Sequence, residues 1–223
     1  MSLTLAIDTS TDVRVGLAAH GAVLASGAVT DPRAHAERLM PLIHETLHNA
    51  ARTLADVTQL VVGVGPGPFT GLRVGVVTAQ TLGFALGVPV RGVCSLDVGA
   101  VGYAGHADAA GEYLADAAGE FLVVSDARRK EVYWARYGAD ASRLTGPFVG
   151  PAAELPDLPV TGPGAELAGG RSTPLDGGLL ALAGPDLPDV GLSPLYLRRP
   201  DAEVPTTRKS TLLQPRLAPG LKR

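Results

Sequence analysis

The stretch AIDTST, residues 6–11, places three polar residues directly after an apolar run. Asp8, Thr9 and Ser10 carry a carboxylate and two hydroxyl groups. A carboxylate at the end of a buried strand can hold a hydrated Mg²⁺ ion, while hydroxyl and backbone N–H groups bind phosphate. The same residue types also satisfy the hydrogen bonds of an ordinary turn. The residues alone favour the turn, and a phosphate site is the alternative interpretation.

The stretch HETLH, residues 44–48, matches the zinc-binding pattern H-E-x-x-H. In that pattern His44 and His48 would bind the metal from one helix face and Glu45 would act as the base. The downstream Gly and His of metzincins are absent, because Ala51 and Leu54 occupy their positions. Both imidazoles also lie well away from the apolar stripe of the helix. We therefore interpret them as exposed residues, and predict neither a metal site nor a catalytic residue in this chain.

The composition describes a globular protein. Hydrophobic residues make up 46% of the 223 residues, charged residues 18%, and the net charge is -3. These values argue against disorder and against a general nucleic-acid coat. Cys94 is the only cysteine, which excludes a disulfide framework and fits a small core residue better than a nucleophile. The start lacks a signal-peptide pattern and no apolar run spans a bilayer, so we expect a cytoplasmic protein without a membrane segment.

The first hundred residues predict a mixed α/β unit. A strand over residues 3–7 is followed by a hairpin that turns at His20-Gly21. Apolar residues at helical spacing then predict helices over 34–51 and 70–86, each followed by a strand, over 60–64 and 88–94. A further helix begins near Ser95. The order β-β-β-α-β-α-β-α is typical of one lobe with a sheet and helices.

The remainder predicts a smaller second lobe. The segments FLVVSDAR and EVYWARYG pair as strands, and beyond Gly146 prolines and glycines leave room only for short elements. We expect an N-terminal lobe over residues 1–104, a C-terminal lobe over 105–200, and a flexible basic tail over 201–223. The cations of that tail are Arg208, Lys209, Arg216, Lys222 and Arg223.

The stretch LVVGVGPGPFTGLRVG, residues 60–75, joins a strand to a helix built from poor helix formers. Its prolines offer no N–H groups and no Lys-Ser/Thr pair follows, which argues against a nucleotide P-loop. Gly71, Gly75, Ala79 and Gly83 recur every four residues and leave a trough along one side of the helix. A glycine inside a helix lowers stability by roughly 1 kcal/mol relative to alanine. Close packing must therefore cover the trough, and either the same domain or a second chain can supply it.

Four motifs together resemble one family. LAIDTST, GVGPGPFTGLRVG, DARRKEVY and PLYLRRPDA, spread over residues 3–202, resemble the TsaB (YeaZ) proteins, bacterial subunits of the tRNA threonylcarbamoyladenosine machinery. The resemblance implies a two-lobed α/β fold of the actin-like ATPase class, related to ribonuclease H, sugar kinases and Hsp70, with a reduced second lobe. Catalytic relatives carry a metal-binding H-x-x-x-H after the strand that follows the glycine-rich helix. Here that stretch is GVCSLDVG, with Ser95, Leu96 and Asp97 and no histidine.

The resemblance also implies a function. A chain of this kind is expected to be a non-catalytic subunit that binds and activates a TsaD-like threonylcarbamoyltransferase. A TsaE-like ATPase would be a further partner, tRNA an indirect one, and the chain would form a homodimer when alone. The alternatives are an ATP-dependent phosphotransferase or ATPase of the same superfamily, relying on Asp8 and Thr9, and a glycoprotease-like zinc hydrolase.

The expected contact surface lies on the first two helices of the N-terminal lobe. The candidate interface residues are Leu39, Ile43, Leu47, Gly71, Leu72, Arg73, Gly75, Val76 and Ala79. Asp8, Thr9 and Ser10 are the candidate vestigial phosphate site. We expect no cofactor, and weak binding of ATP or ADP with Mg²⁺ at this site is the alternative.

Overall fold

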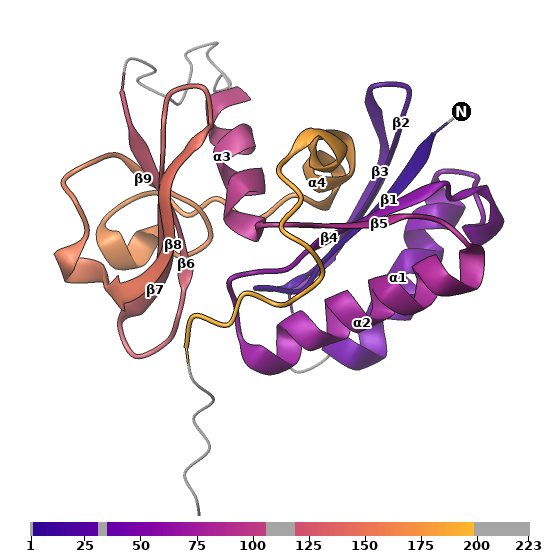
Figure 1. The fold of residues 1–223 in the computed structure, drawn as a ribbon, viewed down its shortest axis with the longest axis horizontal. Helices are drawn as coiled ribbons and strands as arrows, with labels where there is room; N and C mark the ends of the chain where they lie inside the picture. Colours follow the sequence, from indigo (N-terminus) through magenta and orange to yellow (C-terminus); the bar gives the residue numbers. More distant parts are fainter. Residues whose placement is uncertain (1, 31–34, 106–118, 199–223) are drawn as a thin grey trace, which may run out of the picture.

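A computed structural model describes residues 2–30, 35–105 and 119–198 of the chain. These residues form two sheets that lie side by side, with helices packed mainly on the first sheet (Figure 1). The predicted tail over residues 201–223 and the start of the first predicted helix, residue 34, lie outside the described residues.

The first sheet has five strands in the order β3-β2-β1-β4-β5. The strands β1, β2 and β3 form an antiparallel meander, and β4 and β5 continue the sheet parallel to β1. Their bounds are Leu3–Asp8, Val13–Ala19, Ala22–Val29, Gln59–Gly63 and Val90–Val93. The hairpin between β2 and β3 turns at His20 and Gly21, whose φ angles of 55° and 72° suit a two-residue turn with left-handed residues. The predicted order of elements along the chain, β-β-β-α-β-α-β-α, is confirmed.

The strand β1 is buried along its whole length because helices cover both faces of this sheet. Leu5 and Ile7 point to one core, together with the helices α1 (His35–Asn49) and α2 (Phe69–Leu86). Ala6 points to a second core on the opposite face, where α4 (Gly177–Ala183) packs. The helices α1 and α2 agree with the predicted ranges to within two residues at the ends that can be compared.

By length and composition alone, α2 is apolar enough to cross a membrane. Six of its residues are nevertheless buried within the fold, and its N-terminal half is hydrogen-bonded to the end of β1. Such a helix is ordinary for the core of a globular domain. The helix α2 is therefore part of the first lobe.

The second sheet has four strands in the order β8-β7-β6-β9. The pairing of β6 (Phe121–Asp126) with β7 (Glu131–Tyr137) confirms the predicted hairpin. The strands β8 (Arg143–Pro151) and β9 (Val160–Thr161) complete the sheet. Short 3₁₀ turns cover residues 54–56, 152–154, 165–168 and 184–186. The helix α3 (Ser95–Gly105) lies between the two sheets and contacts β6, β7 and α4.

The end of the described chain returns to the first lobe, which corrects the expected division. Residues 105–200 were assigned to the second lobe, but α4 packs on β1, β2 and β3. After α4, the C-terminal segment, residues 187–198, runs along the first sheet, where Val190 donates its N–H to Gly92 and Leu195 donates to Val64. The physical reason is that the second face of the first sheet is apolar and needs a cover. The small residues of α4 supply it, and Gly177 contacts the backbone of β2 at Gly16.

Candidate functional site

Asp8, the first candidate ligand, accepts hydrogen bonds from neighbouring residues of the same chain through both carboxylate oxygens. Its Oδ1 accepts from the N–H of Ser10 at 2.7 Å and from the Ser10 hydroxyl at 2.6 Å. Its Oδ2 accepts from the hydroxyl of Ser95 at 2.6 Å, and that hydroxyl in turn accepts from the N–H of Gly65 at 3.1 Å. The carboxylate thus joins the end of β1 to the proline-rich turn that precedes α2.

Burial raises the pKa of Asp8 above its ordinary 3.8, although the hydrogen bonds from Ser10 and Ser95 act in the opposite direction. The side chain is 2% exposed, and the turn closes over its neighbour: a Cβ at Gly67 would lie 2.5 Å from the carbonyl oxygen of Ser10. A hydrated Mg²⁺ ion or a nucleotide phosphate needs open oxygen and N–H ligands here, and these residues do not fit such a group. At Asp8 the turn, which the residues alone favoured, therefore fits the structure better than the candidate phosphate site.

Thr9 fixes α2 against the end of β1. Its hydroxyl donates to the carbonyl of Gly71 at 2.7 Å and accepts from the N–H of Gly75 at 3.0 Å. A Cβ at Gly71 would lie 2.7 Å from the Thr9 carbonyl oxygen, and one at Gly75 would lie 2.4 Å from the Thr9 hydroxyl oxygen. Further along α2, a Cβ at Gly83 would lie 2.2 Å from a methyl group of Val90. The trough is therefore filled by the first lobe itself.

Most of the expected interface residues consequently belong to the core of the first lobe. Arg73 is exposed, but the other eight are buried in the first lobe. They comprise Leu39, Ile43 and Leu47 on α1 and Gly71, Leu72, Gly75, Val76 and Ala79 on α2. An apolar stripe first covers the sheet of its own domain, and the sequence pattern does not reveal that cover.

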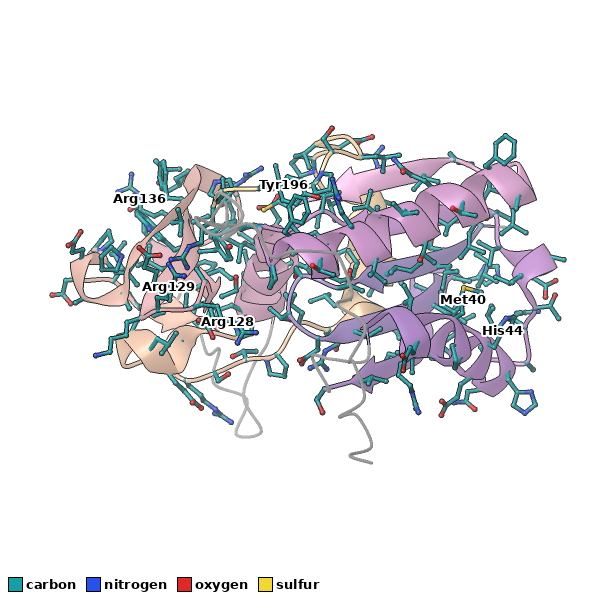
Figure 2. The ribbon with its side chains drawn as sticks, turned by 90° about the horizontal axis from the view of Figure 1, so that it is seen from below. Met40, His44, Arg128, Arg129, Arg136 and Tyr196 are labelled. Atoms are coloured by element: carbon teal, nitrogen blue, oxygen red, sulfur yellow. The ribbon has the colours of Figure 1, made fainter. Side chains whose placement is uncertain are left out.

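The outward face of α2 carries the exposed apolar groups. Phe84 is 91% exposed and Val77 55% exposed, and they lie seven positions apart, so they share one side of the helix. The signal in the sequence was two large apolar residues opposite the glycine face. On α1, Met40 is half-buried and His44 is exposed (Figure 2).

His48 is exposed as well, as predicted for both histidines. Among the described residues no three His, Cys, Asp or Glu side chains are grouped as a metal site would require.

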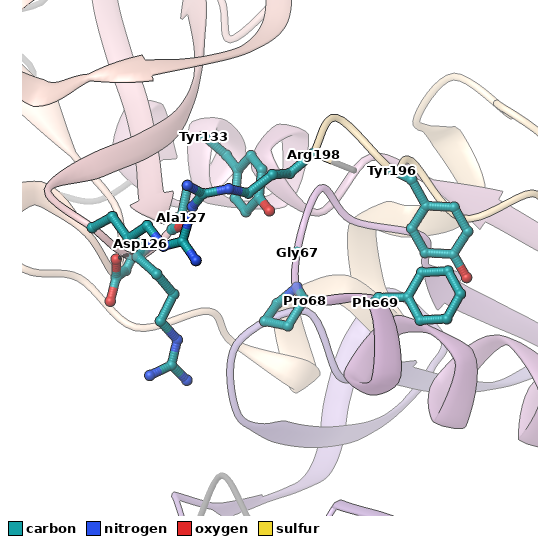
Figure 3. A pocket seen from close by; sticks show the side chains of 10 residues that line it. Gly67, Pro68, Phe69, Asp126, Ala127, Tyr133, Tyr196 and Arg198 are labelled. Carbon is teal, nitrogen blue, oxygen red and sulfur yellow. Dashed lines mark hydrogen bonds between the residues drawn. The ribbon is translucent and has the colours of Figure 1, made fainter. Parts of the chain in front are cut away.

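A second candidate site opens between the lobes. A cavity of about 500 Å³ is lined by the start of α2, by the β6–β7 turn and by the C-terminal segment. Figure 3 shows Tyr196 beside Phe69 on one wall, with Arg198 reaching towards Ala127 on the other. Sequence reasoning used the β6–β7 turn only as a family motif and missed this cavity, because three distant segments form it.

Comparisons with known proteins agree with this architecture. Residues 29–169 match the model of the TsaD family, described as tRNA N6-adenosine threonylcarbamoyltransferase. An uncharacterized protein of Mycobacterium tuberculosis is 45% identical over 219 residues, covering 91% of this chain and 95% of that protein. The structure of YeaZ from Pseudomonas aeruginosa is 31% identical, with a TM-score of 0.64, covering 82% of this chain and 91% of that one.

The chain belongs to the TsaB (YeaZ) family. The tRNA threonylcarbamoyladenosine biosynthesis protein TsaB of Escherichia coli is 36% identical over 141 residues, covering 63% of this chain and 57% of TsaB. A second Pseudomonas aeruginosa structure, of a protein with similarity to peptidase YeaZ, has a TM-score of 0.68 at 31% identity and is covered completely. The predicted fold class, a two-lobed α/β fold of the actin-like ATPase class, is confirmed by these matches.

In this TsaB (YeaZ) chain, a buried polar cluster joins the lobes where the catalytic relatives were expected to hold a metal. Asp97 of α3 accepts a hydrogen bond from the Tyr137 hydroxyl at 2.8 Å and forms an ion pair with Arg143 at 3.2 Å. Both partners lie on the second sheet. Burial raises the pKa of Asp97, and it raises the pKa of the Cys94 thiol to about 12. Cys94 is therefore a buried core residue, as predicted.

Proposed function

We propose that this chain is a non-catalytic, cytoplasmic subunit that binds and activates a TsaD-like threonylcarbamoyltransferase. The partner would form threonylcarbamoyladenosine next to the anticodon of tRNA. Membership of the TsaB (YeaZ) family supports the pathway, since curated relatives of Escherichia coli and Bacillus subtilis carry the name tRNA threonylcarbamoyladenosine biosynthesis protein TsaB. The enclosed Asp8 and Thr9 remove the residues on which the ATP-dependent alternative relied.

The exposed face of α2 carries the proposal that the chain acts by docking. Phe84 leaves nearly its whole ring in water, and Val77 extends the apolar surface along the same side of the helix. Burying a phenylalanine side chain contributes about 1.5–3 kcal/mol, so a partner that covers this face gains much of its affinity from it. We assign the face to the TsaD-like subunit. A second copy of this chain would compete for it when that subunit is absent.

The docking face is tested by replacing Phe84 with glutamate. We expect Phe84→Glu to weaken association with the TsaD-like protein of the same organism by at least about tenfold, which corresponds to about 1.4 kcal/mol. Isothermal titration calorimetry measures the affinity, and thermal unfolding checks the fold. Because the ring is 91% exposed, the stability of the isolated chain should change little.

Leu144→Glu provides the matched control, since Leu144 is 44% exposed but lies on β8 of the second sheet. This variant should bind the partner as the unaltered chain does. Equal affinity of Phe84→Glu and the unaltered chain would reject the docking face. Sedimentation of Phe84→Glu and of the unaltered chain, each without the partner, shows whether the same face forms the homodimer.

Activation is tested with the transfer reaction itself. Adding the chain to the TsaD-like subunit, with threonylcarbamoyl adenylate and tRNA, should raise the rate of transfer, and Phe84→Glu should require more protein for the same rate. A TsaE-like ATPase enters as a further component of the multiple-turnover assay. Transfer by this chain in the absence of the TsaD-like subunit would contradict a non-catalytic role.

A further inference from the structure

The outer strand of the first sheet, β3, leaves one side of its backbone without a neighbouring strand. It stands at the end of the strand order β3-β2-β1-β4-β5, and no other strand that the structure describes pairs with its outer side. In an edge strand, alternate residues point both their N–H and their C=O groups away from the sheet. Such a row of unpaired groups is a template for an added strand.

The three other edges of the two described sheets are covered, short or protected. The C-terminal segment covers β5, where Val190 donates its N–H to the carbonyl of Gly92 at 2.8 Å. The strand β9 has two residues, and β8 carries Arg143, Pro147 and Pro151. Short edges, charges and prolines are common means of preventing strand addition. The strand β3 has none of these, because its eight residues, AVLASGAV, include neither a charge nor a proline.

The regular part of this edge runs from Ala25 to Val29. A bulge at Leu24 separates it from the start of the strand, and beyond the bulge the pairing with β2 is continuous. The side chains of a strand added here would point alternately towards α1 and towards α4. The two sides therefore decide which side chains the added strand can carry.

A groove accompanies this part of the edge on the side of α4. Ser26 and Ala28 are exposed and point to that side, since Gly27 between them faces α1. The groove has a volume of about 280 Å³. Its other walls are formed by Arg14 of β2 and by the chain that leads into α4, residues 174–177. A side chain of an added strand can therefore enter it.

The groove presents one cationic and one anionic group. Arg14 pairs with Asp12 at 2.7 Å, but its Nε is buried without a hydrogen-bond partner among the described residues. Asp176 accepts from the N–H groups of Gly178 and Leu179 through Oδ1, and a carboxylate has a second oxygen that can accept. Asp176 would repel a carboxylate of a ligand, and Arg14 would repel an ammonium group. A neutral carboxamide suits the groove because it has both donors and an acceptor.

We propose that the β3 edge binds an extended segment of another protein, whose backbone pairs with residues 25–29 and whose glutamine or asparagine side chain enters the groove. Strand addition at a sheet edge is a general mode of peptide recognition, in which main-chain hydrogen bonds give affinity and side-chain pockets give specificity. The rest of the bound segment is uncharged, since a charge beside this uncharged strand would lose water without gaining a partner. The surface shares no residue with the docking face on α2 or with the cavity between the lobes.

The experiment uses the full-length chain alone and the fluorescein-labelled peptide Val-Thr-Val-Gln-Val-Thr-Val, with fluorescence anisotropy as the measure of affinity. Replacing the glutamine of the peptide by glutamate or lysine should weaken binding by at least about fivefold. Two further peptides carry N-methyl groups on alternate residues, each blocking the N–H donors of one side of the strand. One should lose binding and the other should stay within about twofold, because only one side of an added strand pairs with β3.

Ala28→Lys should weaken binding of the glutamine peptide by at least about tenfold, because it places a charge at the edge and in the groove. Ala22→Lys is the matched control, since Ala22 is also an exposed alanine of β3 but precedes the bulge and lies outside the groove lining. It should bind within about twofold of the unaltered chain, as expected for an exposed charge. Asp176→Asn keeps a good helix cap and should remove the discrimination against the glutamate peptide. Thermal unfolding checks the fold of each variant.

Three results would overturn the proposal: equal affinities of the two N-methylated peptides, equal losses in Ala28→Lys and Ala22→Lys, or no saturable binding at millimolar concentration. Equal binding of the glutamine, glutamate and lysine peptides would also contradict it, because the groove would then select nothing. If sedimentation shows a dimer of the chain that Ala28→Lys abolishes, the edge belongs to a second copy and not to another protein. No partner protein is present in these measurements, so none of these failures bears on the docking proposal.

Discussion

The hydroxyl of Thr9 determines how closely α2 approaches the end of β1. It uses both its donor and its acceptor capacity on the backbone of the helix, at Gly71 and Gly75. The residue is fully buried, so the hydroxyl cannot turn away without leaving these groups unpaired. Thr9 thus explains why two helix positions hold glycine, since its carbonyl oxygen lies against Gly71 and its hydroxyl oxygen against Gly75.

Replacing Gly75 with alanine should therefore destabilise the protein, although alanine is the better helix former. The new Cβ would lie 2.4 Å from the Thr9 hydroxyl oxygen. We expect the free energy of unfolding to fall by about 1–3 kcal/mol, because overpacking outweighs the gain in helix propensity of about 1 kcal/mol. Urea unfolding followed by circular dichroism measures the change.

Gly105→Ala controls for helix propensity, since no other residue that the structure describes lies within 4 Å of a Cβ at Gly105 in α3. This variant should be neutral or slightly more stable. Adding Thr9→Ala to Gly75→Ala should cost less than the sum of the two single changes, because the small residue removes the overlap. Additive losses would show that Thr9 is not the atom in contact.

At this scale the sequence predicted the need for close packing but not what supplies it. The spacing of Gly71, Gly75 and Gly83 indicates a trough, and that feature is present. Whether a neighbouring chain or the same lobe fills it depends on Thr9 and Val90, which approach only after the sheet has formed. The interface residues predicted from the sequence are therefore mostly core residues, and the exposed Phe84 was not among them.

The helix α3 ties the two sheets together through Asp97. Tyr137 and Arg143 reach it from β7 and β8, and a second carboxylate oxygen is buried without a hydrogen bond among the described residues. Removing a carboxylate from water disfavours its ionised form. This is why burial, the largest effect, raises the pKa of Asp97 despite the nearby arginine.

Asp97→Asn should consequently change the pH dependence of stability. A raised pKa means that the folded protein keeps the Asp97 proton at a pH where the unfolded chain has lost it. The free energy of unfolding should therefore decline as the pH rises above 3.8 through the folded pKa, with a slope of at most about 1.4 kcal/mol per pH unit. Asparagine has no such proton, so the variant should lack this part of the decline.

Urea midpoints of both proteins between pH 4 and neutral pH give the comparison. Asp8 also has a raised pKa, but it is present in both proteins and cancels in the difference. Parallel pH profiles would show that Asp97 titrates as it does in the unfolded chain. A steeper profile for Asp97→Asn would give the pKa shift the opposite sign.

The elements differ in how far the sequence predicted them. The helices α1 and α2 are long and show a clear apolar period, so their ranges were predicted closely. The helix α4 has seven residues in the stretch GGLLALA, and it lies in the region where the sequence predicted only short elements. Asp176 gave a signal, because its carboxylate accepts from the N–H groups of Gly178 and Leu179 as an N-terminal cap. Such a short helix depends on packing against the first sheet rather than on local preference.

The whole molecule is held together by contacts that cross between the lobes. Leu195 packs against the large core of the first lobe and also against the core that includes Phe121 and Tyr137. The ion pair of Arg198 with Glu131 continues the same C-terminal segment onto the second sheet. The division at residue 104 could not show this, because a segment far along the chain closes both lobes.

Leu195→Ala should separate the unfolding of the two lobes. Trp134, the single tryptophan, lies on β7 with its ring 5.0 Å from that of Phe148, so its fluorescence reports on the second sheet. Circular dichroism is dominated by the helices, and α1, α2 and α4 pack on the first sheet. The unaltered chain should show one urea midpoint by both probes, as a single cooperative unit does. Leu195→Ala should lose about 2 kcal/mol and show two midpoints.

Leu192→Ala is the decisive comparison because Leu192 lies on the same segment but packs only against the core of the first lobe. The midpoints of this variant measured by fluorescence and by circular dichroism should coincide, since the connection between the lobes stays intact. If both variants keep coincident transitions, the cross-lobe contacts of Asp97 and Arg198 suffice to couple the lobes without Leu195. If the unaltered chain already shows two midpoints, the lobes are independent units, and the cavity between them can change its width before either lobe unfolds.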